Sequence, residues 1–174
     1  MLTAGAADNV IGPGNLVSGN NAQGIVLDNS AHDNRVVGNK VGTDVTGTYA
    51  IPNHWSGVLI QLGGHHNIIG GPNPGDGNLC SGDNKGDGIT IHGVGSDYNG
   101  VTGNYCGTEA LGTAGVPNTG HGVSIYGGAS RNIVGPDNRI AFNAYHGVRV
   151  NGSGTVRNTI TRNLINGNWG LGIA

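Results

Sequence analysis

Residues 88–91 read Gly-Ile-Thr-Ile, and this pattern of a glycine, an aliphatic residue, a variable residue and a second aliphatic residue recurs along the whole chain. Its six copies begin at Gly24, Gly57, Gly88, Gly122, Gly147 and Gly170. The intervals between these glycines are 33, 31, 34, 25 and 23 residues. Self-similarity at this period indicates a stacked repeat protein, in which each unit packs on its sequence neighbours.

Each interval also contains two shorter apolar segments, and an asparagine leads nearly every one. The first set starts at Asn9, Asn34, Asn67, Asn99, Asn132 and Asn158, and the second starts at Asn15, Asn39, Asn78, Asn104, Asn138 and Asn163. Short alternating runs bounded by Gly and Asn predict strands and turns, and no sustained helical period is present. We therefore expect one all-β domain over residues 1–174, a right-handed parallel β-helix of about six turns with three short strands per turn.

Residues at equal phase then stack about 4.8 Å apart along the axis. The first two inward columns are Ile25, Val58, Ile89, Val123, Val148 and Leu171, and Ile11, Val36, Ile69, Val101, Val134 and Ile160. These columns are wholly aliphatic, as a dry core requires. Cys80 and Cys106 fall in the third column on adjacent turns, either as small buried residues or as a disulfide pair. The 23 asparagines are expected at the corners, where side-chain amides can bond along the stack.

A longer repeat overlies the short one. Residues 34–53 (NRVVGNKVGTDVTGTYAIPN) recur as residues 99–118 (NGVTGNYCGTEALGTAGVPN), which predicts a loop inserted on every second turn. This pattern resembles the parallel β-helix repeat family of bacterial secreted and cell-surface polypeptides, a pectate-lyase-like solenoid. The resemblance covers nearly the whole chain and implies an extracellular or cell-surface location. It implies no single activity, because the family includes lyases, hydrolases, epimerases, adhesins and spacers.

Composition excludes several classes of function. The net charge is −2 and Lys and Arg total 8 without a basic cluster, which argues against a nucleic-acid partner. No apolar run approaches 18 residues, so we expect no membrane insertion. Residues 1–4 are too short for a signal peptide. The acids Asp44 and Glu109, one in each long loop, are expected to cap turns rather than to hold a metal, and no cofactor is expected.

The two ends of the chain share one phase. Met1-Leu2 is in phase with Leu59-Ile60, the chain stops at Ile173-Ala174 six turns later, and neither end has a capping sequence. We therefore expect either a piece of a longer solenoid or a unit that associates head to tail through open ends. Residues 1–97 carry 8 acids and 3 bases, whereas residues 98–174 carry 2 acids and 5 bases. This asymmetry favours head-to-tail self-association.

Polar and aromatic side chains gather beside the first strand of several turns. The candidate ligand-binding residues on this flank are Trp55, Asp87, His92, His121, Tyr126, His146 and Arg149. Aromatic platforms combined with planar polar groups are typical of sugar-binding surfaces, so a polysaccharide is the expected partner. The other reading is that these side chains only cover the strand edge.

An enzymatic reading remains as the alternative. Gly120-His121-Gly122 resembles a segment of polygalacturonase-type hydrolases, but the chain lacks the paired aspartates that those enzymes need. A minimal lyase or hydrolase of acidic polysaccharides would rely on Asp87, His121, His146 and Arg149. The favoured hypothesis is a non-catalytic structural or interaction module of an exported surface protein, which contacts carbohydrate or stacks into a fibre.

Overall fold

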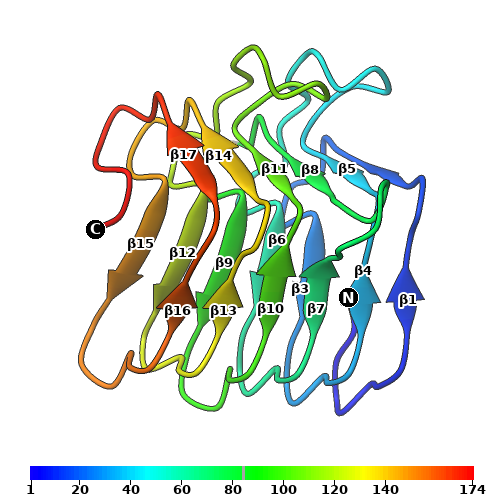
Figure 1. Ribbon diagram of the computed structural model, residues 1–174. Coiled ribbons are helices and arrows are strands. Elements are labelled where there is room, and N and C mark those ends of the chain that lie inside the picture. The colour runs from blue at the N-terminus through cyan, green and yellow to red at the C-terminus, as the bar shows by residue number, and fades with distance from the viewer. Residues whose placement is uncertain (84) are drawn as a thin grey trace.

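The computed structural model describes residues 1–83 and 85–174 as an all-β parallel solenoid of about six turns (Figure 1). Successive turns contribute strands to three parallel sheets, and each of β1 to β14 pairs with the strand three places further along the chain. These residues include no helix that is long and apolar enough to cross a membrane. The predicted parallel β-solenoid is confirmed.

The three sheets run along the solenoid axis, with β1 at one end and β15 to β17 at the other (Figure 1). The first sheet contains β1 (Val10–Ile11), β4 (Arg35–Val36), β7 (Ile68–Gly70), β10 (Gly100–Thr102), β13 (Ile133–Val134) and β16 (Thr159–Ile160). The second contains β2 (Leu16–Val17), β5 (Lys40–Val41), β8 (Leu79–Cys80), β11 (Tyr105–Cys106), β14 (Arg139–Ala141) and β17 (Leu164–Asn166). The third contains β3 (Ile25–Leu27), β6 (Val58–Ile60), β9 (Ile89–His92), β12 (Val123–Tyr126) and β15 (Val148–Asn151).

The core consists of the predicted aliphatic columns. Val58, Ile89 and Val123 pair in register and are fully buried, and each fully buried aliphatic side chain contributes about 1.5–3 kcal/mol. Cys80 pairs with Cys106 in the third column, where both thiols are free and buried. The cysteines are therefore small core residues, and the disulfide alternative is wrong.

Three asparagine ladders occupy the corners. The two predicted ladders precede the first and second sheets, and a third ladder was missed because the strands of the third sheet begin several residues after it rather than directly after it. The third ladder contains Asn20, Asn53, Asp83, Asn118, Asn143 and Asn168. In each ladder a side-chain amide donates to the side-chain oxygen one turn further along, as Asn67 Nδ2 does to Asn99 Oδ1 at 3.1 Å. The ladders satisfy polar groups that would otherwise be buried without partners.

The register of the last turn differs from the prediction by two residues. Val148 forms a parallel bridge with Ile173, not with Leu171. The glycine in phase with Gly147 is therefore Gly172, because Asn168 stacks on Asn143 and sets a spacing of 25 residues. Leu2 bridges Leu27, which pairs with Ile60, so the predicted phase of the first residues is confirmed.

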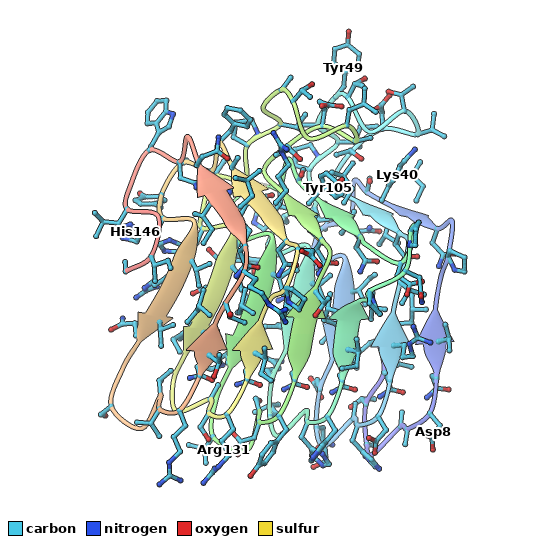
Figure 2. The ribbon with its side chains drawn as sticks, in the orientation of Figure 1. Asp8, Lys40, Tyr49, Tyr105, Arg131 and His146 are labelled. Atoms are coloured by element: carbon cyan, nitrogen blue, oxygen red, sulfur yellow. The ribbon has the colours of Figure 1, made fainter. Side chains whose placement is uncertain are left out.

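Each long loop closes on an antiparallel bridge, between Thr43 and Ala50 in one and between Thr108 and Gly115 in the other. Asp44 accepts hydrogen bonds from the backbone of Thr48 and Tyr49, and the Thr46 hydroxyl contributes most to lowering its pKa. Glu109 caps its loop in the same way, so the predicted turn-capping role of both acids is confirmed. Figure 2 shows Tyr49 at the tip of the first loop.

Candidate functional site

The predicted flank is the outer face of the third sheet. The register places Thr90, Ser124 and Arg149 in one outward column, because β9, β12 and β15 pair residue for residue. His92 and Tyr126, the last residues of β9 and β12, form a second column. This arrangement brings side chains from three successive turns onto one surface, as parallel stacking at about 4.8 Å requires.

Two hollows indent this face. The first has a volume of about 370 Å³ and is lined by Lys85, Asp87, Thr119, Gly120, His121, Tyr126, Tyr145 and Arg149. The second, also of about 370 Å³, includes Gln23, Trp55, Ser56, Gln61, Thr90 and His92 in its lining. Both hollows are lined by Lys85, Asp87 and Tyr126, so they join into one depression that we call the flank trough. Six of the seven candidate residues line it, and His146 does not.

Asp87 organises the floor of the flank trough. Its Oδ1 accepts the backbone N–H of His121 at 2.7 Å, and its Oδ2 accepts the Thr90 hydroxyl at 3.0 Å. The Thr90 hydroxyl also lies 2.9 Å from that of Ser56 on the preceding turn. Each carboxylate oxygen therefore already accepts a bond from the protein, and together with the Thr90 hydroxyl the carboxylate connects three turns of the solenoid.

His121 presents a hydrogen-bond donor to the trough. Its Nδ1 accepts the backbone N–H of His146 at 3.1 Å, which assigns the ring proton to Nε2. Burial lowers the pKa of His121, nearby Arg149 and His146 lower it further, and Asp87 opposes them. The imidazole is therefore neutral at pH 7 and offers an N–H rather than a free basic nitrogen.

His146 supports His121 from the C-terminal side. The two rings stack with centroids 5.1 Å apart and an interplanar angle of 17°. The Nδ1 of His146 accepts the backbone N–H of Leu171 at 2.8 Å, so this ring also carries its proton on Nε2. Figure 2 shows His146 toward the C-terminal end of the molecule. His146 thus positions His121, and His146 itself does not line the flank trough.

Aromatic rings form the sides of the trough. Tyr126 packs against His92 with ring centroids 4.5 Å apart, and the guanidinium carbon of Arg149 lies 5.8 Å from the Tyr126 ring centroid. Burial, and after it the charge of Asp87, raises the pKa of Tyr126, so its hydroxyl stays protonated. Trp55 is 46% exposed and meets His54 edge-on. The trough therefore combines flat apolar surfaces with donors.

Lys85 and Tyr145 line the trough although neither was among the predicted site residues. Lys85 lies in a turn before β9 and has a left-handed backbone with φ of 56°, and turns of unequal length have no register that could be read from the sequence. Tyr145 could have been predicted from the sequence, because it lies directly before the candidate residue His146. In the structure its ring centroid is 5.6 Å from that of His121. With Lys85, the trough has two cationic groups against the single carboxylate of Asp87.

The chemical capacity of the trough is recognition of a polar ligand. Glycosidic cleavage needs one carboxyl group as acid and a second as base or nucleophile, and the described lining contributes one carboxylate with both oxygens engaged. Neither long loop contributes a residue to the described lining of either hollow. Among residues 1–83 and 85–174, no three His, Cys, Asp or Glu side chains converge as a metal site. Burial raises the pKa of Cys106 to about 12, so its thiol is protonated and unreactive.

No protein-family model matches this chain, and no curated protein or solved structure matches it either. The fold class rests on the observed sheet topology and ladders. Function has to be argued from the site, because solenoids of this class serve many unrelated purposes.

Proposed function

We propose that the chain is a non-catalytic interaction module that contacts a polysaccharide along the flank trough. The observation that carries the proposal is one continuous depression with aromatic surfaces at Trp55 and Tyr126 and planar polar groups at Arg149 and Asp87. Sugar rings present apolar faces and equatorial hydroxyls, and such a surface matches both. An open trough that crosses several turns suits an extended chain better than a small compact ligand.

The state of the polar groups supports binding rather than cleavage. His121 has no free basic nitrogen directed at the trough, because Nδ1 is held by the backbone of His146. The Asp87 oxygens accept hydrogen bonds from His121 and Thr90, which fix the carboxylate while each oxygen keeps a lone pair that can accept a ligand hydroxyl. These groups are held to recognise hydroxyl or carboxyl groups by hydrogen bonding.

A matched pair of tryptophans tests the proposal. Trp55→Ala removes an aromatic surface from the trough, whereas Trp169→Ala removes a tryptophan that is 87% exposed and lies outside it. In affinity electrophoresis through neutral and acidic polysaccharides, Trp55→Ala should weaken retention about tenfold, the effect of losing about 1.4 kcal/mol of contact, and Trp169→Ala should not. Equal effects of the two variants, or no retention of the wild type by any polysaccharide, would refute the proposal. Release of shortened or unsaturated products by the wild type would favour the enzymatic alternative.

Head-to-tail association is a second candidate function, and a column of charges favours it. The residues that precede the first ladder all have left-handed backbones and stack from turn to turn as Asp8, Asp33, His66, Tyr98, Arg131 and Arg157. The column changes from acidic to basic along the axis, and Figure 2 shows Asp8 and Arg131 on the same edge of the molecule. A second copy placed end to end would bring Arg157 beside Asp8, a favourable pairing.

The hydrogen bonds of the last turn identify the residue that tests this association. Val148 bonds to Gly172 and Ala174, so the N–H and C=O of Ile173 point away from β15. Ile173→Pro should therefore block a further turn without removing a bond within the chain, whereas Leu171→Pro removes a bond to His146. Light scattering over a concentration series at low and high salt should show assembly that salt and Ile173→Pro both weaken. A monomer at every concentration would exclude this function.

We also infer right-handed coiling, because connections between parallel strands are right-handed in about 98% of cases. Placement of the module outside the cell rests on the resemblance of its repeat to secreted polypeptides. Fractionation of cells that express the native gene tests that placement, and recovery in the cytoplasm would contradict it.

A further inference from the structure

A cluster of histidines lies on the corner that precedes the first sheet, away from the flank trough. His32 and His65 occupy equivalent positions on adjacent turns and are joined by a parallel bridge. His66 follows in the next column, where Asp33 occupies the equivalent position one turn earlier. Three imidazoles and one carboxylate therefore share a small surface area, and neither proposed function uses the paired imidazoles of His65 and His66.

Two of these imidazoles face each other through the same ring atom. The Nδ1 of His65 lies 2.9 Å from the Nδ1 of His66, and the rings are nearly perpendicular at 87°. A hydrogen bond between two such nitrogens needs a proton on one and a lone pair on the other. Moving that proton to the Nε2 of the same ring frees both lone pairs, and a rotation of the rings then directs the two lone pairs toward one metal ion beside the line that joins the nitrogens.

Stacking holds both rings in place. His65 stacks on His32 with centroids 5.0 Å apart and an angle of 17°, and His66 stacks on Tyr98 at 5.0 Å and 12°. The guanidinium carbon of Arg131 lies 5.6 Å from the Tyr98 ring centroid. Because each histidine ring already stacks on another ring, little side-chain freedom would be lost when a ligand binds.

The charge around the pair favours a cation. Asp33 is exposed one turn from His66, and its side chain makes no hydrogen bond or ion pair with the described residues. The guanidinium of Arg131, which lies near the Tyr98 ring, is 4.0 Å from an Asp97 oxygen and is partly neutralised by it. The corner therefore has one uncompensated carboxylate beside the two imidazoles.

We propose that His65 and His66 form a chelating site for a divalent transition metal of tetragonal preference, Cu²⁺ or Ni²⁺. A metal bound about 2.05 Å from each nitrogen would subtend an angle of about 90° at their separation of 2.9 Å. That angle is the one between adjacent ligands in square-planar and octahedral sites, whereas a tetrahedral zinc site needs nitrogens about 3.4 Å apart. Imidazole is a preferred ligand of both metals, and water completes the coordination.

The test is a titration of tag-free, chelator-treated protein with Cu²⁺ in the presence of glycine, which competes for weak sites. Calorimetry should show one strong site per chain, and electron paramagnetic resonance should show two nitrogen ligands. His66→Asn should weaken binding at least tenfold, because one of two ligands is lost. Asparagine tolerates the left-handed backbone of residue 66, whose φ is 54°, so this variant should fold.

His54→Ala is the matched control, since His54 packs on Trp55 and has no histidine partner of this kind. It should bind Cu²⁺ like the wild type, and His65→Ala should bind like His66→Asn. Strong binding that survives in both His65→Ala and His66→Asn would overturn the proposal. So would an equal loss in His54→Ala, or a wild type that binds no more tightly than free imidazole.

Discussion

The second and third asparagine ladders pass through the same turns, yet they differ at one position. In the second ladder, Asn78 accepts from Asn39 through Oδ1 and donates from Nδ2 to the backbone carbonyl of Val36 and to Asn104, so every polar atom has a partner. In the third ladder the corresponding place is taken by Asp83. Its Oδ1 accepts from Asn53 at 3.1 Å, whereas its Oδ2 is buried without a partner among the described residues.

The difference shows what the amide contributes. At the Asp83 position the amide of an asparagine would donate to Asn118 Oδ1 and to the backbone carbonyl of Val41, by analogy with Asn118, which donates to Asn143 and Cys80. A carboxylate can only accept, so its second oxygen faces acceptors. Burial raises the pKa of Asp83 to about 7, and only the protonated acid can supply the missing donor. An aspartate can therefore replace an asparagine in the ladder with all its hydrogen bonds made only when its carboxyl group is protonated.

Breaking the complete ladder should have the largest effect. Asn104→Ala would leave buried groups of Asn78 and Ile69 without partners, at about 1–3 kcal/mol each. We expect a loss of about 3–5 kcal/mol in the free energy of unfolding, measured by urea denaturation. Asn15→Ala is the control, because Asn15 is exposed at the end of the same ladder. A similar loss in both variants would show that position within the stack is unimportant.

Repairing the third ladder should have the next largest effect. The folded pKa of Asp83 lies above its ordinary value of 3.8, so the folded state holds the proton more tightly than the unfolded state. The contribution is complete below about pH 4 and is lost as pH rises toward about 7, a change on the order of 4 kcal/mol. Asp83→Asn should therefore stabilise the protein by a similar amount at pH 8.

Measurements at two pH values separate this effect from a general change in packing. At pH 4, where the wild-type acid is protonated, Asp83→Asn and the wild type should have nearly equal midpoints of urea denaturation. A variant that is less stable than the wild type at pH 8 would show that the charged acid is already satisfied in the folded protein.

The smallest effect concerns Ser124, a neutral counterpart of Asp83. Its Oγ is buried without a partner, whereas the hydroxyl of Thr90 on the neighbouring strand bonds to Asp87 and lies 2.9 Å from that of Ser56. Ser124→Ala should raise stability by up to about 1 kcal/mol, independently of pH, because it removes an unsatisfied hydroxyl. Thr90→Val should lower stability by a similar amount. Denaturation midpoints that move in the opposite directions would contradict this assignment.

Much of the molecule could be predicted from the sequence because each turn repeats the same order of asparagine, aliphatic and glycine positions. The aliphatic columns and two ladders followed from phase alone, as Ile25, Val58 and Ile89 illustrate by pairing as predicted. The error in the last turn arose where Gly170 and Gly172 both precede an aliphatic residue. Only the stacking of Asn168 on Asn143 distinguishes them, and that stacking belongs to the ladder that was missed.

The flank trough was predictable in its residue types and less so in its geometry. Six of the seven candidate residues line it, because outward columns follow from register. Lys85 could not be placed, since it lies in a turn of irregular length. The engagement of Asp87 and the tautomer of His121 also required coordinates, because each depends on a backbone N–H from another turn.

The sequence by itself determined the solenoid, since the period, the aliphatic phase and the asparagine corners admit one way of stacking. The tertiary structure alone decided what each polar side chain can do. Whether Asp83 holds a proton, whether His121 offers a donor, and whether His65 faces His66 all depend on distances of about 3 Å between residues that side-chain conformation or the stacking of separate turns brings together. Periodicity specifies which residues are neighbours, whereas hydrogen-bond partners and burial specify their chemistry.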